Sequence, residues 1–253
     1  MSASEPVVHY LKDYQAPYFS IEAVHLQFEL HPTATRVTNT MHIKTLTIQP
    51  HLVLLGEQLK LVQVLLNGVD ITQACLCDAE SLSVPLNDFM NTFDLVIVTE
   101  IAPQKNTALE GLYRTSGNYC TQCEAEGFRK ISYYLDRPDV LSCFTTKIIA
   151  DKTDNRVLLS NGNLIESGDL PNNRHYAVWH DPFKKPCYLF ALVAGNLECI
   201  EDVFCTADGR DVVLRIYVEA QNIDKCEHAM ASLKNPCAGT KLALASFMTW
   251  IFT

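Results

Sequence analysis

The sequence lacks any cluster of lysine or arginine side chains. Its 20 basic residues are outnumbered by 29 acidic ones, and the formal net charge is -9. Without a basic patch there is no electrostatic footprint for a phosphate backbone. Nucleic acid is therefore not an expected partner.

Long apolar runs are also missing. The longest uncharged apolar stretch, 242–252, falls well short of the ~20 residues that a membrane-spanning helix needs, so no membrane partner is expected. Residues 1–17 lack the basic start and the apolar run of a secretory signal. We therefore expect a cytoplasmic location.

The cysteines lack the dense spacing of a small disulfide-rich domain. Ten of them are scattered between Cys75 and Cys237, so most are expected to be buried thiols. What is present is a 253-residue chain that is 48% hydrophobic. That is enough for one large domain, or for one domain and part of a second.

Period-two alternation dominates the patterning before Asn222. Val24, Leu26 and Phe28 alternate with polar residues, as in a strand with one buried face. Similar patterns, or β-branched and apolar runs, predict further strands at 36–48, 59–66, 69–72, 93–101, 200–205 and 211–218. Asn67-Gly68 and Asp208-Gly209 favour hairpin turns between neighbouring strands.

One short helix is expected near the end of the chain. Asn222 can cap a helix that runs through Lys234. Its inward-facing side chains would be Ile223, Cys226, Met230 and Leu233. The chain as a whole is therefore expected to be mainly β, an antiparallel β-sandwich or saddle.

A long, specific segment resembles the bacterial aminopeptidase N family. Residues 106–144 read NTALEGLYRTSGNYCTQCEAEGFRKISYYLDRPDVLSCF, similar to the segment that lines the substrate cleft in that family. Shorter stretches continue the likeness: TTKIIAD at 145–151, LSNGN at 159–163, HDPFKKPCYLFALVAGN at 180–196, SLKN at 232–235 and, more weakly, LGEQLKL at 55–61.

The resemblance implies a zinc metallopeptidase that removes single residues from peptide N-termini. It implies a β-saddle domain at 1–196, resting on a thermolysin-like catalytic domain whose first hairpin and helix would occupy 197–235. An apolar face is then expected to be exposed where the rest of that catalytic domain would pack. The alternative is a stand-alone β-sheet module that binds peptides or a partner protein.

Gln122 and Glu124 are the candidate substrate-binding residues. They match the family positions that line the first specificity pocket and hold the free α-amine of the substrate. A carboxylate opposite an ammonium forms a charge-assisted hydrogen bond, which orients the peptide. Without the resemblance, Glu124 would be interpreted as an ordinary loop carboxylate. We expect Glu126 to be structural and 136–139 (DRPD) to form a turn.

Two other patterns suggest a metal or redox site only weakly. Cys120 and Cys123 form a Cys-x-x-Cys motif, but no second pair has the spacing of a zinc knuckle. We expect two thiols near the cleft. Thiol redox or zinc storage is a third interpretation. His175 and His180 have no helix to place them at ligand spacing, and no histidine is a metal-ligand candidate.

The catalytic motifs of the family do not occur in the 253 residues. There is no His-Glu-x-x-His, which would bind zinc and activate water, and no Gly-Ala-Met-Glu-Asn. No catalytic or metal-binding residue is therefore assigned. We expect the chain to be an inactive N-terminal fragment when alone, with zinc a cofactor of the full-length family only.

The tail, 236–253 (PCAGTKLALASFMTWIFT), departs from the family, which continues with Met-x-Trp-Asp-Glu. Shifted by one base, and with a TGA stop after Thr253, permitted codons can read Met-Arg-Trp-Asp-Glu-Thr-Arg-Phe-Gly-Leu-Val-Tyr-Asp-Leu-Asp-Ile-Tyr-Met, which is similar to the family's continuation. Met248 and Trp250 have single codons, so the shifted frame must place aspartate after each, as the Asp-Leu-Asp pattern requires. This suggests that a one-base frameshift truncates the family sequence here. A genuine divergent C-terminal helix is the alternative.

Overall fold

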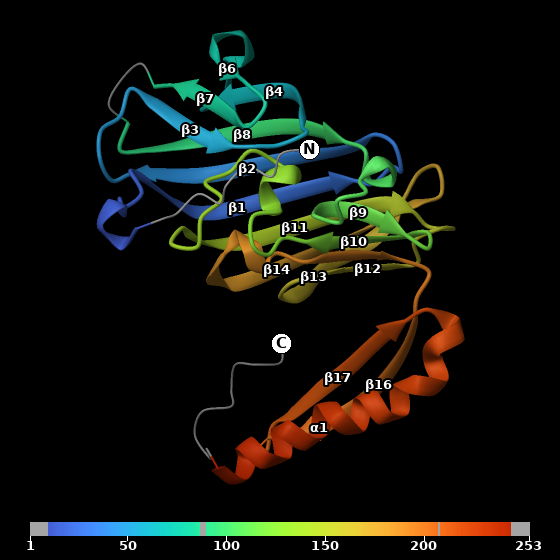
Figure 1. Ribbon diagram of the computed structural model, residues 1–253. Coiled ribbons are helices and arrows are strands. Elements are labelled where there is room, and N and C mark those ends of the chain that lie inside the picture. The colour runs from blue at the N-terminus through green and yellow to red at the C-terminus, as the bar shows by residue number, and fades with distance from the viewer. Residues whose placement is uncertain (1–9, 87–89, 207, 244–253) are drawn as a thin grey trace, which may run out of the picture.

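An eight-stranded sheet forms the centre of the fold (Figure 1). The computed structural model describes residues 10–86, 90–206 and 208–243. The strand order is β13-β14-β11-β1-β2-β8-β4-β5. In chain order these strands are β1 (Phe19–Glu29), β2 (Thr35–Thr45), β4 (Lys60–Leu66), β5 (Val69–Asp70), β8 (Thr92–Ile101), β11 (Leu141–Asp151), β13 (Asn163–Leu170) and β14 (Arg174–Pro186).

Alternating apolar residues give this sheet its buried face. Val24 and Phe28 of β1 and Met41 of β2 are fully buried, while their polar neighbours point the other way. The predicted strands in these regions are confirmed. The Asn67-Gly68 hairpin is also confirmed, since both residues have positive φ and join β4 to β5.

One pairing in the sheet is parallel. β1 runs alongside β11 from Ala23 opposite Cys143 to Glu29 opposite Ile149, whereas the other ladders of the sheet are antiparallel. A parallel pair needs a long crossover. Here the crossover holds the two smaller sheets' first strands and the candidate substrate loop.

Two smaller sheets share a continuous apolar core with the large one. The four-stranded sheet has the order β12-β15-β10-β9, with β9 (Gly111–Thr115), β10 (Asn118–Gln122), β12 (Val157–Ser160) and β15 (Leu192–Gly195). The three-stranded sheet has the order β3-β7-β6, with β3 (His51–Leu55), β6 (Leu76–Cys77) and β7 (Ser81–Pro85). The 3₁₀ turn η1 (Leu11–Asp13) precedes β1. Other short 3₁₀ turns lie between strands: η2 (Thr72–Ala74), η3 (Pro103–Lys105), η4 (Phe128–Lys130) and η5 (Cys187–Leu189).

Aromatic packing fixes the segment that follows the candidate substrate loop. The ring of Phe128 in η4 lies 4.9 Å from Tyr134 and 5.5 Å from Phe190, edge to face in both cases. Such pairs are worth about 0.5–1.5 kcal/mol beyond the burial of their area. Thr99 of β8 also donates a hydrogen bond of 3.1 Å to the carbonyl of Ile131. The segment is therefore held against the large sheet.

A hairpin and a helix follow the main body of sheets (Figure 1). They comprise β16 (Glu198–Cys205), β17 (Asp211–Val218), the 3₁₀ turn η6 (Ala220–Lys225) and α1 (Cys226–Ala243). The predicted strands are confirmed. Two polar contacts tie this unit to the main body: Asn118 to Glu219 at 3.2 Å and Arg156 to Glu198 at 3.2 Å.

The predicted helix differs from the observed one at both ends. Asn222 is not its cap, because it lies inside η6, whose N-cap position is Glu219. At the other end α1 continues to Ala243, beyond the predicted end at Lys234. Local propensity does not account for this extension, because Asn235, Pro236 and Gly239 are poor helix formers. Residues 244–253 of the tail lie outside the described residues.

No helix in the described ranges combines the length and the apolar character needed to cross a bilayer.

Candidate functional site

The candidate substrate residues lie where β10 ends and turns into η4. Gln122 is the last residue of β10, and its Nε2 donates a hydrogen bond of 3.2 Å to the backbone carbonyl of Glu124. The loop 123–127 is closed by a 2.9 Å hydrogen bond from the backbone N–H of Gly127 to the carbonyl of Cys123. The structure thus brings Gln122 and Glu124 together, and both side chains are exposed.

Gly127 lets this loop fold back onto the β9–β10 hairpin. A Cβ atom here would lie 2.4 Å from the carbonyl oxygen of Gln122 and 2.9 Å from the backbone nitrogen of Gly111. Both are far inside contact distance and belong to backbone atoms, which cannot swing away. The loop therefore approaches the hairpin as closely as it does only because residue 127 has no side chain.

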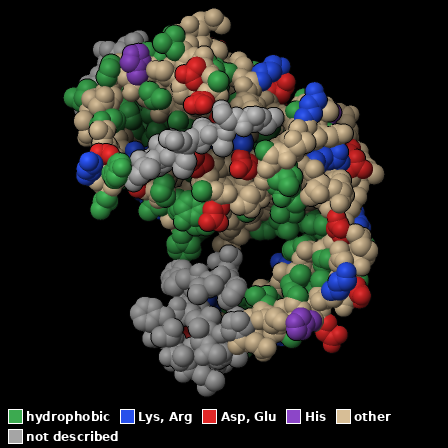
Figure 2. All heavy atoms as spheres, in the orientation of Figure 1, with side chains coloured by type: hydrophobic (Ala, Val, Ile, Leu, Met, Phe, Trp, Pro, Cys, Tyr) green, Lys and Arg blue, Asp and Glu red, His purple; other side chains and the backbone are tan. Residues whose placement is uncertain are grey.

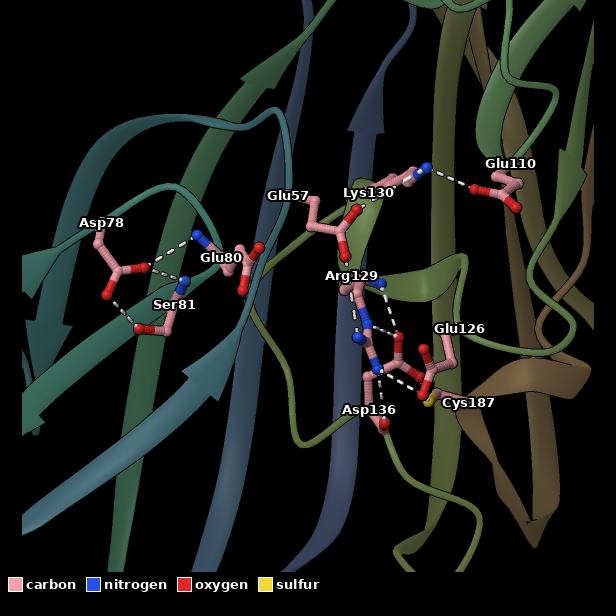
Figure 3. A network of polar contacts seen from close by, with 10 residues as sticks. All are labelled: Glu57, Asp78, Glu80, Ser81, Glu110, Glu126, Arg129, Lys130, Asp136 and Cys187. Atoms are coloured by element: carbon pink, nitrogen blue, oxygen red, sulfur yellow. Dashed lines mark hydrogen bonds and ion pairs between the residues drawn. The ribbon is translucent and has the colours of Figure 1, made fainter. Parts of the chain in front are cut away.

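A buried ion pair lies directly behind the loop (Figure 3). Asp136 Oδ2 accepts hydrogen bonds from the backbone N–H of Arg129, at 3.1 Å, and from its Nε, at 3.0 Å. Arg129 Nη2 donates another of 3.3 Å to the carbonyl of Asp136. The side chain of Asp136 is 2% exposed and that of Arg129 13%. The carboxylate of this ion pair is therefore almost completely shielded from water.

Further charges surround Arg129 and its neighbour Lys130. Glu126 Oε1 lies 3.2 Å from Arg129 Nη2, and Glu57 Oε1 lies 3.8 Å from Nη1. Lys130 forms ion pairs with Glu57 and Glu110. Burial alone would lower the pKa of Arg129, but the hydrogen bond to Asp136 and the surrounding carboxylates raise it above its usual value. The guanidinium is therefore firmly charged.

Asp136 is not part of the turn predicted for 136–139. The turn itself is present at Pro138–Asp139, where the N–H of Val140 donates to the carbonyl of Arg137. Asp136 precedes it and points into the interior. Sequence reasoning missed its partnership with Arg129. The available signal was an acidic and a basic residue, each next to a large apolar residue, Leu135 and Phe128. Glu126, predicted to be structural, contacts Arg129.

The Cys-x-x-Cys motif does not have the chemistry of a reactive dithiol. Burial raises the pKa of both the Cys120 and the Cys123 thiol, and Cys123 is 2% exposed. Reactive or metal-binding cysteines need a lowered pKa, because the thiolate is the active form. The redox and zinc-storage interpretation is therefore not supported.

Among residues 10–86, 90–206 and 208–243, no three histidine, cysteine, aspartate or glutamate side chains are grouped so that they could hold a metal ion. His175 Nε2 lies 2.6 Å from the carbonyl of Asn155, and His180 Nδ1 lies 3.0 Å from Thr145 Oγ1. The described residues thus do not fit the zinc ion that the resemblance implies for the full-length family.

A hollow separates the main body from the hairpin and helix. It has a volume of about 1050 Å³ and is lined by residues of β12, β13, β14 and β17, including Trp179, Asp181 and Tyr217. Figure 2 shows this hollow from the side, with apolar side chains on the main body above it. On the hairpin, Val203 and Val213 pair with each other and are about half exposed, on the face opposite the buried Leu214.

Comparison with known proteins gives consistent matches along the chain. Residues 19–189 match the sequence profile of the Peptidase M1 N-terminal domain. Aminopeptidase N of Escherichia coli (strain K12) is 48% identical over 232 residues, which are 91% of this chain and 26% of that protein. The chain therefore spans about a quarter of the length of this relative.

Solved structures share the fold. A crystal structure of Legionella pneumophila aminopeptidase A in complex with aspartic acid superposes with a TM-score of 0.88 at 33% identity, over 94% of this chain and 28% of that one. An M1 zinc metallopeptidase from Deinococcus radiodurans gives a TM-score of 0.71 at 15% identity, over 81% of this chain and 48% of that one. The second likeness concerns the fold alone.

Proposed function

The chain belongs to the Peptidase M1 N-terminal domain family, and on this basis we propose that its loop at Gln122 and Glu124 binds the free α-amine of a peptide. In this proposal the chain is the substrate-holding portion of a zinc aminopeptidase. Residues 1–196 form its β-saddle domain and 197–235 the first elements of its catalytic domain. We further propose a cytoplasmic setting, which suits the buried free thiols Cys123, Cys187 and Cys226.

The observation that carries the proposal is an exposed carboxylate on an anchored loop. Glu124 is exposed, while the residues on either side of it, Cys123 and Gly127, are buried and hydrogen-bonded to each other. Because the loop is already ordered, binding of an ammonium group to this carboxylate does not carry the entropic cost of ordering a mobile loop. Gln122, bonded to the backbone of Glu124, adds a polar group on the same side.

Peptide cleavage is assigned to residues outside this sequence. In a complete zinc aminopeptidase the metal activates the attacking water. The 253 residues contain no His-Glu-x-x-His, and those described offer no set of three metal ligands. We therefore propose that the 253-residue chain binds a peptide N-terminus but releases no amino acid when alone. Its apolar hairpin face, with Val203 and Val213, is a contact surface for the rest of a catalytic domain.

We also propose an origin for the tail, on the basis of its sequence alone. Residues 236–253 would derive from a shifted reading frame that follows the family-like SLKN at 232–235. Sequencing the coding DNA around Asn235 tests this. The expected result is a neighbouring frame that reads Met-x-Trp-Asp-Glu, and its absence would refute the frameshift.

The experiment that tests amine binding is a titration with alanyl-alanine, followed by NMR shifts of the Gln122 side-chain amide and the Gly127 backbone amide. N-acetyl-alanyl-alanine is the control, since acetylation removes the positive charge of the amine and adds only a small acyl group. We expect saturable shifts with the free dipeptide and none with the acetylated one. Equal shifts, or none with either peptide, would refute amine binding.

A further inference from the structure

The contacts behind the substrate loop form a continuous chain from the core to the loop (Figure 3). At the core end is Cys187 of η5, which is 1% exposed and whose Sγ donates a hydrogen bond of 3.0 Å to Asp136 Oδ1. Asp136 Oδ2 in turn accepts the two hydrogen bonds from Arg129. Both oxygens of one buried carboxylate are thus used, one toward the core and one toward the loop.

Arg129 passes the constraint on to the loop. Its backbone N–H is one of the two donors to Asp136, so the carboxylate holds the η4 backbone as well as the side chain. Its carbonyl accepts a 2.9 Å hydrogen bond from the N–H of Glu57. Its Nη2 lies 3.2 Å from Glu126, a member of the loop that carries Glu124. The η4 turn is therefore fixed from three directions, two residues after the loop closes at Gly127.

Stability alone is a weak explanation for such a pair. Two buried charges lose their hydration, and apolar residues of similar size often stabilise a protein as well or better. What an ion pair with several hydrogen bonds adds is a single geometry. Arg129 donates hydrogen bonds to Asp136 from its backbone N–H, its Nε and its Nη2, and together these bonds fix the orientation of η4 relative to Asp136.

We propose that Arg129 and Asp136 are positioning residues, which hold the loop 123–127 so that the Glu124 carboxylate faces the peptide amine. This rests on the proposed amine-binding function. Neither residue touches the substrate. They act through η4 and Gly127, and their loss leaves Glu124 present but free to move, which weakens binding of the amine.

The test combines two measurements on the 253-residue chain and its Asp136→Asn variant. The first is hydrogen exchange at the Gly127 amide, with the amide of Ile97 in β8 as a reference for the intact sheet. The second is the alanyl-alanine titration. We expect Asp136→Asn to speed exchange at Gly127 at least about tenfold and to weaken dipeptide binding by about tenfold, the equivalent of one lost hydrogen bond to a charged group. Exchange at Ile97 should not change.

The matched control is Asp139→Asn. Asp139 lies three residues further along, carries the same side chain and pairs with Arg137 at 2.6 Å on the surface. Its replacement makes the same chemical change outside the chain of contacts. We expect no change in exchange at Gly127 or in dipeptide binding.

The outcomes separate the two proposals. If the unmodified chain binds the dipeptide and Asp136→Asn binds it equally well, positioning is wrong and amine binding stands. If the unmodified chain does not bind it, amine binding is wrong, and the positioning of an amine ligand by this pair is overturned with it. If Ile97 loses protection in Asp136→Asn, the variant has unfolded and Arg129→Lys decides instead. The Arg129→Lys variant keeps the positive charge but lacks the several N–H donors of the guanidinium. Unchanged exchange at Gly127 in this variant would then overturn the proposal.

Discussion

Asp136 Oδ2 accepts hydrogen bonds from both the backbone nitrogen and Nε of Arg129, at 3.1 and 3.0 Å. The two residues are seven positions apart, and the segment between them packs Ile131 and Tyr134 into the core. One carboxylate therefore determines where the candidate substrate loop leaves the sheet.

Asp136→Ala is expected to lower the free energy of unfolding by about 3 kcal/mol, the lower end of the range for breaking a buried ion pair. The lower end applies because Arg129 keeps some contact with water and with Glu126. Urea denaturation followed by circular dichroism measures it. Asp139→Ala, which breaks an exposed pair, should cost about 1 kcal/mol or less. Equal losses at both positions would contradict the prediction.

Gly127→Ala is expected to displace the loop and to weaken alanyl-alanine binding. The backbone φ of −82° at this position suits alanine, so the cost arises from the contacts of the new Cβ with the backbone of Gln122 and Gly111. Overpacking of this kind costs about 1–3 kcal/mol. Gly117→Ala is the control: its φ of +86° makes it costly too, but nothing lies within 4 Å. Dipeptide binding should fall only in Gly127→Ala, as measured by the NMR titration.

The Asp70 carboxyl is expected to titrate far below its usual range. The hydrogen bonds from Gln63 and from the side chain and backbone of Thr72 lower the pKa of Asp70 to about 2. Because the folded-state value lies below the unfolded one, this contribution to stability is present above pH about 3.8 and is lost as the pH falls through about 2. Gln63→Ala should raise the pKa toward the ordinary value. An NMR titration of the Asp70 carboxyl carbon checks both, and an unchanged pKa in Gln63→Ala would be a contradiction.

The thiols are expected to differ sharply in reactivity. Burial raises the pKa of the Cys123 and Cys187 thiols, which are also shielded from reagents, whereas Cys77 and Cys199 are exposed. Native-state alkylation with iodoacetamide, analysed by mass spectrometry, should label the exposed pair and leave the buried pair unlabelled until urea is added. Rapid labelling of Cys123 in the folded chain would contradict the packing described around the loop.

Strands with clear alternation could be predicted from the sequence. β1, β8 and the β16–β17 hairpin follow from local patterns, because the side-chain period and the turn residues are local properties. The parallel pairing of β1 with β11 could not be predicted, because more than 100 residues separate the strands and a local sequence pattern does not identify the strand with which it pairs. The helix was predicted too short because Pro236 and Gly239 are poor helix formers, so the local sequence gives no signal that α1 continues to Ala243.

The candidate site was predictable only in part. Gln122 and Glu124 emerged from a resemblance over a long motif, and alternation or composition alone would have left Glu124 an ordinary loop carboxylate. Arg129 and Asp136 were missed as a pair because their contact depends on the way the chain folds back between them. A charged residue beside a buried aromatic is only a weak signal until its partner is placed by the fold.

The Glu124→Gln variant tests whether Glu124 binds a peptide's free amine. This variant keeps the size and hydrogen-bonding reach of the side chain but removes its charge. We predict that the unmodified chain prefers alanyl-alanine over its N-acetyl form by about 10- to 100-fold, the range for one hydrogen bond between charged groups. In Glu124→Gln this preference should disappear. If the preference is the same in both proteins, Glu124 is not the amine-binding group.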